Sequence, residues 1–137
     1  MILINEWLPN PLGNDATGEW VEIFNSGGDR VDLAGWKLIT RGGKGVNLSG
    51  GINPREYRVF ERTQTKLTLH NTDGKLELYN STGQLVDQQS FFGVAPEGSS
   101  FSRIKQGSFV FSEPTYKSEN VLVLKQAIIN NVYPREV

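Results

Sequence analysis

The 137-residue chain contains no cysteine, which excludes disulfides and a thiolate metal site. Histidine is nearly absent as well. His70 stands alone, and no known motif ties a serine or a carboxylate to it, so we expect a structural role. No apolar run approaches the roughly 18 residues of a membrane span, and no signal-peptide pattern is present. We therefore expect no enzyme activity, no cofactor and no membrane insertion in this chain.

Helical periodicity is also missing, because no convincing 3.6-residue pattern occurs before residue 120. Turn residues instead recur about every 8–12 residues between short apolar or alternating stretches. This spacing predicts an all-β fold, namely an immunoglobulin-like antiparallel β-sandwich. The length suits one domain with a hydrophobic core of its own.

Two stretches rich in aromatic and β-branched residues predict the central strands of this sandwich, at residues 18–25 and 31–38. Between them, Gly27 and Gly28 are expected to supply the positive φ of a hairpin turn. Each strand carries one tryptophan that we expect to be a pillar of the core: Trp20 and Trp36.

The net charge of −1 conceals an uneven distribution. Residues 1–36 carry six acidic residues against one basic residue, whereas residues 37–66 carry seven basic residues against two acidic ones. Period two in a predicted strand places Arg58 and Arg62 on the same face. The basic segment is either an ordinary solvated face or a surface for an anionic partner. Its residues are Lys37, Arg41, Lys44, Arg55, Arg58, Arg62 and Lys66.

A group of oxygen-bearing side chains near the polar loop 10–18 offers the hard ligands that calcium prefers. The spacing matches no defined calcium loop, and asparagine and aspartate are also ordinary turn formers. The sequence leaves both interpretations open for Asn10, Asn14, Asp15, Glu19 and Glu22.

Four pieces of sequence resemble the lamin-tail domain family. They are residues 4–6 (Ile-Asn-Glu), 19–25 followed by 31–38, 69–79 with 83–87, and 98–103 with 114–120. The resemblance implies an immunoglobulin-like sandwich without catalytic residues. In nuclear lamins such a domain follows a coiled coil and contacts DNA, chromatin and membrane proteins; in bacteria it is an accessory module of larger, often exported proteins. The chain has no heptad repeat, and its long loop 10–18 is more similar to the bacterial type.

The resemblance spans residues 2–120, so we expect one domain over 1–120 and a separate C-terminal tail over 121–137. Residues 127–134 repeat the pattern of residues 3–9, with isoleucine, asparagine and proline in register. The repeat indicates either the first strand of a following module in a tandem array or an ordinary final strand. A lone strand of this kind would be able to exchange between molecules.

Together these features predict a non-catalytic interaction or adhesion module of a larger bacterial protein, extracellular or in the cell envelope. Its loops and sheet edges would bind a protein or cell-surface partner. The alternative is a module, in the cytoplasm or outside it, that binds the DNA or RNA backbone through the basic segment 37–66. Salt separates the two, because phosphate contacts weaken steeply as salt rises.

Overall fold

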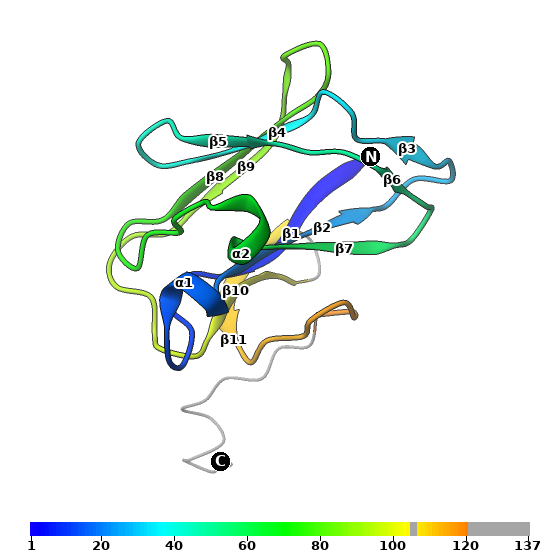
Figure 1. The fold of residues 1–137 in the computed structure, drawn as a ribbon. Helices are drawn as coiled ribbons and strands as arrows, with labels where there is room; N and C mark the ends of the chain where they lie inside the picture. The colour runs from blue at the N-terminus through cyan, green and yellow to red at the C-terminus, as the bar shows by residue number, and fades with distance from the viewer. Residues whose placement is uncertain (105–106, 121–137) are drawn as a thin grey trace, which may run out of the picture.

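A computed structural model describes residues 1–104 and 107–120 of the chain as two packed antiparallel β-sheets (Figure 1). The five-stranded sheet has the order β11 (Phe109–Ser112), β10 (Ser100–Arg103), β1 (Ile2–Leu8), β2 (Trp20–Asn25) and β7 (Tyr57–Glu61). The four-stranded sheet has the order β5 (Gly45–Asn47), β4 (Lys37–Thr40), β8 (Lys75–Tyr79) and β9 (Leu85–Ser90). This architecture confirms the predicted all-β, immunoglobulin-like sandwich.

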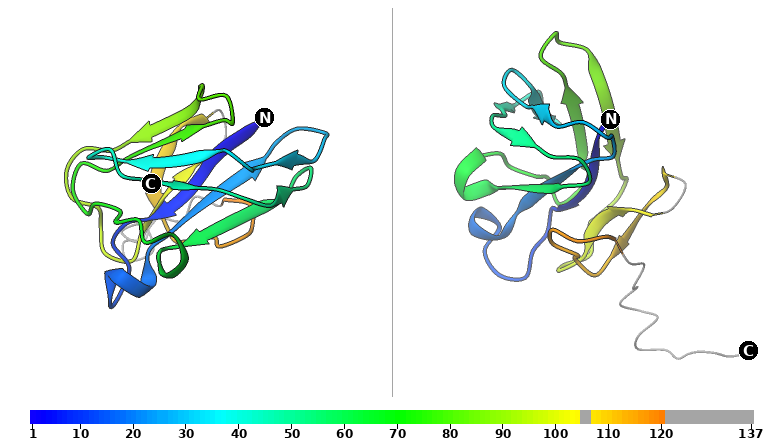
Figure 2. Two further views of the ribbon diagram at one scale, coloured as in Figure 1. Left: turned by 45° about the horizontal axis from the view of Figure 1, so that its top comes forward. Right: turned by 90° about the vertical axis from the view of Figure 1, so that its right-hand side faces the viewer.

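Short elements complete the fold. Strands β3 (Val31–Asp32) and β6 (Gly51–Ile52) form a two-stranded ribbon. Helices α1 (Asp15–Gly18) and α2 (Arg62–Thr65) are single turns at one end of the sandwich (Figure 2). Neither helix, nor any other in the described ranges, is long and apolar enough to cross a membrane.

The core lies between the two sheets and is built by period two. Ile4 and Ile23 point inward from the five-stranded sheet, and Leu38 and Leu76 point inward from the four-stranded sheet. The largest fully buried side chain among the described residues is Trp7. The centroid of its ring lies 5.1–6.1 Å from the centroids of three phenylalanine rings. This aromatic group closes the part of the core near β10 and β11.

The predicted core tryptophans are therefore wrong in part. Trp20 is buried as predicted, but on the opposite face of β2 from Val21 and Ile23 and outside the cluster between the sheets, where the centroid of the Tyr116 ring lies 5.3 Å from that of the tryptophan ring. Trp36 is only partly buried and packs at the margin of the core.

The predicted hairpin after β2 is also wrong, because the chain crosses there to the other sheet. β2 pairs with β1 and β7, whereas β4 pairs with β5 and β8. Neither Gly27 nor Gly28 has a positive φ. The Asn25 side chain holds the turn instead, accepting from the Gly27 N–H at 3.0 Å and donating to the Asp29 carbonyl at 2.8 Å.

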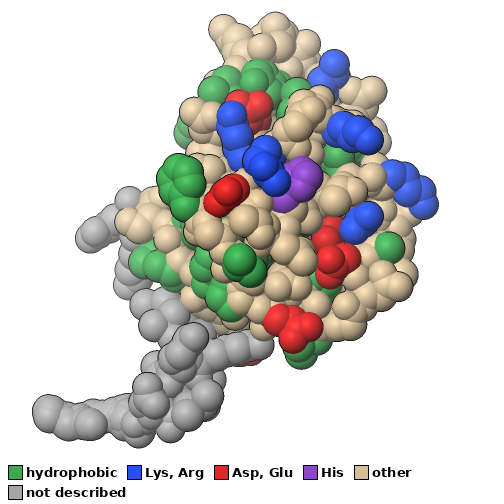
Figure 3. Space-filling model, turned by 90° about the vertical axis from the view of Figure 1, so that its left-hand side faces the viewer, with side chains coloured by type: hydrophobic (Ala, Val, Ile, Leu, Met, Phe, Trp, Pro, Cys, Tyr) green, Lys and Arg blue, Asp and Glu red, His purple; other side chains and the backbone are tan. Residues whose placement is uncertain are grey.

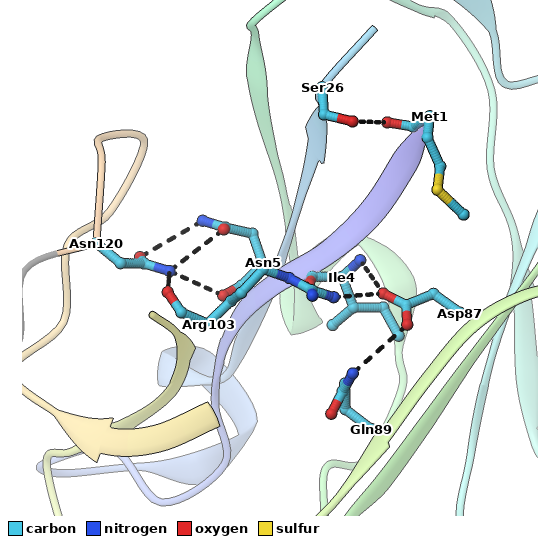
Figure 4. Close-up of polar contacts among 8 residues, drawn as sticks. All are labelled: Met1, Ile4, Asn5, Ser26, Asp87, Gln89, Arg103 and Asn120. Atoms are coloured by element: carbon cyan, nitrogen blue, oxygen red, sulfur yellow. Dashed lines mark hydrogen bonds and ion pairs between the residues drawn. The ribbon is translucent and has the colours of Figure 1, made fainter. Parts of the chain in front are cut away.

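Strand β1 contains a β-bulge that the sequence pattern does not predict. Its pairing with β2 shifts between Ile4 and Glu6, so Asn5 is the extra residue. The Asn120 amide donates to the Asn5 backbone carbonyl at 3.0 Å and to the Arg103 carbonyl at 2.6 Å (Figure 4). The bulge therefore anchors a segment that lies more than a hundred residues away in the chain.

A charged clamp ties the two sheets together beside this bulge. Asp87 on β9 accepts from the Ile4 N–H at 2.9 Å and forms an ion pair with Arg103 on β10 at 2.7 Å. Arg103 also donates to the Ile4 carbonyl at 3.0 Å (Figure 4). One carboxylate thus connects β9 of one sheet with β1 and β10 of the other.

Residues 113–120, which we call the closing segment, cross the outer face of the five-stranded sheet. Glu6 and Glu22 are cross-strand neighbours on this face, and both are fully buried. The Thr115 N–H donates to Glu6 at 2.8 Å, and the Lys117 N–H donates to Glu22 at 2.6 Å. The predicted following module lies in residues 121–137, outside the described residues.

Candidate binding surface

The seven basic residues of the predicted surface do not form one patch. Arg41 and Lys44 on the β4–β5 turn, together with Lys66 after α2, line a single hollow of about 400 Å³. Figure 3 shows the face on which lysine and arginine side chains surround the single histidine. Lys37 and Arg55 are exposed but do not line this hollow. We call the first site the cationic hollow.

Local geometry explains how the two residues of the turn are presented. The hairpin is closed by the Thr40 N–H, which donates to the Lys44 carbonyl at 2.8 Å. Gly42 and Gly43 both have positive φ, at 98° and 85°, which a side chain would disfavour. The glycine pair therefore turns the chain sharply and leaves the flanking Arg41 exposed at the rim.

His70 joins the two walls of the cationic hollow. Its ring Nε2 lies 2.9 Å from the Arg41 carbonyl oxygen, so the ring N–H donates to the β4–β5 turn. Within residues 1–104 and 107–120, no serine hydroxyl or carboxylate bonds to the ring. The contact is that of a residue which holds a loop in place.

Two of the predicted binding residues are engaged elsewhere. Arg58 donates to the Ser49 carbonyl at 2.7 Å and lies over the Phe60 ring at 4.9 Å. Arg62 forms an ion pair with Glu19 at 3.3 Å. The prediction that both arginines share a strand face is wrong, because β7 ends one residue before Arg62, which begins α2.

The charges of the cationic hollow are not neutralised by the described part of the chain. Across those residues, no carboxylate lies within 4.0 Å of Arg41, Lys44 or Lys66. Among the described residues, the Lys66 ammonium group donates only to the Thr63 carbonyl, at 2.8 Å. An anion entering the hollow would meet three cations without displacing an internal partner.

A second hollow, of about 620 Å³, shares Arg41 with the first. Its other lining residues include Lys75, Gln88 and Phe92, and the ring of Phe92 is 91% exposed. Asp73 lines this hollow as well, so an almost fully exposed phenylalanine stands beside amide groups and charges of both signs, which suits a contact surface. Lys75 could not be singled out from the sequence, since only the fold brings it to Arg41.

The fold brings only two of the candidate calcium ligands together: the Asn71 amide donates to Asn10 Oδ1 at 3.4 Å and to Asp15 Oδ2 at 3.3 Å. Asn14 caps α1, accepting the N–H of its second residue at 2.8 Å, while Asn10 donates to a backbone carbonyl. Glu19 is buried beside α2, and Glu22 is buried under the closing segment. No group of three histidine, cysteine or acidic residues suited to a metal ion occurs in the described ranges.

A family model of the Lamin Tail Domain matches residues 1–93, which is well over half of the chain. The chain belongs to the lamin tail domain family. No curated protein matches it. The lamin tail domain of this chain continues structurally beyond the matched residues, because β10 and β11 complete its five-stranded sheet.

The residues that carry the family resemblance have structural contacts. Asn5 forms the bulge and donates to Glu22 at 2.8 Å. Glu6 accepts from the Ser100 hydroxyl at 2.5 Å and from the Thr115 hydroxyl at 2.8 Å. Since these polar groups are satisfied inside the domain, the lamin tail motif explains the fold and not a ligand site.

Two buried glutamates of the lamin tail domain have altered acidities. Burial raises the pKa of Glu19 to about 7, against the opposing effects of the Leu69 N–H and Arg62. Burial also raises the pKa of Glu22 to about 7, opposed by hydrogen bonds from Asn5 and Lys117. Both groups hold a proton more tightly in the folded chain than in the unfolded one.

The free energy of unfolding is therefore expected to fall as the pH rises from about 4.5 to about 7. Below this window both glutamates are protonated in both states, and the stabilising contribution is complete. As the pH rises across this window, each glutamate can lower the free energy of unfolding by roughly 3 kcal/mol, at about 1.4 kcal/mol per unit of pKa shift. Urea denaturation at several pH values measures this slope, and Glu22→Gln should remove about half of it. A flat or rising profile in the wild type would contradict the expectation.

Proposed function

We propose that this lamin tail domain is a non-catalytic interaction or adhesion module of a larger bacterial protein that is exported or attached to the envelope. In this proposal, its loops contact a protein or cell-surface partner. One observation carries it. Arg41 and Lys44 of the β4–β5 turn converge with Lys66 on one hollow, and the three lack any internal acidic partner in the described residues. Unpaired convergent charge on rigid loops favours recognition of an acidic surface.

Binding to the backbone of DNA or RNA is the second candidate, and the same three cations support it. Several features favour a protein partner. Among the described residues that line the cationic hollow there is no phenylalanine, tyrosine or tryptophan to stack a base, and the His70 ring is bonded to the Arg41 carbonyl. The chain also carries a net charge of −1. Arg58 and Arg62 bond to other residues of the domain, so fewer basic side chains are free to contact the phosphates of a nucleic acid.

We expect poly-L-glutamate to bind the cationic hollow and to shift the amide resonances of Arg41, Lys44 and Lys66 in an NMR titration. Lys44→Glu and Lys66→Glu should each raise the Kd at least about fivefold, the size expected for one exposed charge contact. Lys37→Glu reverses an exposed charge on β4 outside the hollow, so it is the matched control and should leave the Kd nearly unchanged.

Oligo-dT and duplex DNA are titrated in parallel from low to physiological salt. Tighter binding to DNA than to poly-L-glutamate, lost with the Lys44 and Lys66 variants, would replace the protein partner by a nucleic acid. Shifts confined to residues outside the hollow, or equal effects of all three variants, would show that the hollow is not the contact surface.

A further inference from the structure

One wall of the cationic hollow is the stretch of residues 67–70, which follows Lys66, the left-handed residue that ends α2, and belongs to neither sheet. Leu67 and Leu69 are buried, while Thr68 between them is exposed, as period two requires of an extended chain. The Leu69 N–H donates to the Glu19 carboxylate at 2.8 Å. The stretch is therefore fixed from its inner side by a buried acid.

The outer side of this stretch carries unpaired peptide groups. The Leu67 and Leu69 N–H groups both bond to side chains of the domain. By contrast, within residues 1–104 and 107–120, neither the N–H nor the carbonyl of Thr68 has a hydrogen-bond partner. Alternate residues of an extended chain direct their peptide groups to opposite sides. Residues 67–70 thus resemble a short edge strand in which the N–H groups of Leu67 and Leu69 are bonded and both peptide groups of Thr68 are free.

The unpaired peptide groups and the unpaired cations occur at the same hollow. Thr68 lines it together with Arg41, Lys44 and Lys66, and His70 fixes the two walls to each other. Its volume of about 400 Å³ lies within the range of pockets that enclose a small ligand or a few residues of a peptide. Main-chain pairing supplies affinity to an extended peptide, and the surrounding side chains supply its specificity.

We propose that the cationic hollow binds an extended acidic segment of a partner protein, which pairs with the main chain at Thr68 and directs carboxylates to Arg41, Lys44 and Lys66. The inference rests on the proposed function and names the partner's chemistry. A polypeptide has the N–H that the free Thr68 carbonyl needs, whereas a phosphodiester backbone has no such donor. The proposal therefore favours a peptide over a nucleic acid.

Strand geometry determines which acidic sequence fits best. Successive side chains of an extended peptide alternate between its two faces, so acids at every second residue all point the same way. A partner segment with acidic residues alternating with threonine presents one acidic face to the hollow. Threonine at the other positions favours the extended conformation.

The test uses the full chain and the labelled peptide (Glu-Thr)5, with two analogues that are N-methylated either at all glutamates or at all threonines. We expect (Glu-Thr)5 to bind and to move the Thr68 amide resonance. At least one analogue should bind at least fivefold more weakly, because one set of N–H groups faces Thr68. Lys44→Glu should raise the Kd of (Glu-Thr)5 at least fivefold, and Lys37→Glu should change it less than twofold.

The outcomes separate this inference from the proposed function. Equal binding of all three peptides with a static Thr68 resonance overturns main-chain pairing, while binding of poly-L-glutamate at the hollow still supports the function. No response of the hollow to either the peptides or poly-L-glutamate overturns both. Binding of oligo-dT alone, sensitive to Lys44→Glu, assigns the hollow to nucleic acid and also overturns the inference.

Discussion

Replacing Trp7 with alanine is expected to lower the free energy of unfolding by about 3–5 kcal/mol, the range measured for large aromatic residues in cores. Trp7 is 1% exposed and contacts the rings of Phe91, Phe101 and Phe109. Its removal leaves a cavity at the centre of this aromatic group, since packed rings relax only partly into such a space. Urea denaturation followed by circular dichroism measures the loss without depending on tryptophan fluorescence.

Trp36→Ala is the matched control for this experiment. Trp36 is only partly buried at the margin of the core, so its replacement should cost clearly less, on the order of 1–2 kcal/mol. An equal loss from both variants would mean that the aromatic group around Trp7 is not the main support of the core.

The fold class could be predicted from turn spacing, but the role of Trp7 could not, and the bulge explains why. Ile2 and Ile4 point into the core, so unbroken alternation would direct Glu6 inward and Trp7 outward. The extra residue, Asn5, reverses the phase, and the structure buries Trp7 in the core and places Glu6 on the outer face. A single sequence contains no signal for this shift, because the residues that hold the bulge are distant in the chain.

For the candidate surface, too, the sequence predicts the local charge but not the tertiary contacts. The charge imbalance over residues 37–66 is visible in the sequence, but the partners of each cation are not. Arg62 is neutralised by Glu19, and the cationic hollow exists because His70 joins its two walls through the Arg41 carbonyl. Residue types alone do not predict which peptide groups, such as those of Thr68, lack a hydrogen-bond partner in the fold.

The Glu6→Ala variant is expected to lose about 3–4 kcal/mol of stability, because Glu6 joins two parts of the chain that are far apart in sequence. Its carboxylate is fully buried and accepts from the Ser100 hydroxyl and from both the N–H and the hydroxyl of Thr115. Alanine removes the acceptor of the Thr115 N–H and leaves the two hydroxyls with only their second contacts, Ser100 to the Ser102 hydroxyl and Thr115 to the Asn120 side chain. Losing hydrogen bonds to a buried carboxylate costs about 1.5–3 kcal/mol each.

The loss in Glu6→Ala should be concentrated in the closing segment, since Thr115 of that segment bonds to Glu6 through both its N–H and its hydroxyl. Hydrogen exchange should accelerate more at the Thr115 and Lys117 amides than at Ile23 in the core. The surface control is Glu77→Ala, where an ion pair with Lys75 at 3.2 Å is partly exposed and worth less than about 1 kcal/mol. If Glu6→Ala costs no more than Glu77→Ala, or if Thr115 keeps its protection, then Glu6 does not hold the closing segment, and the outer face of the sheet is stabilised by the contact between Trp20 and Tyr116 instead.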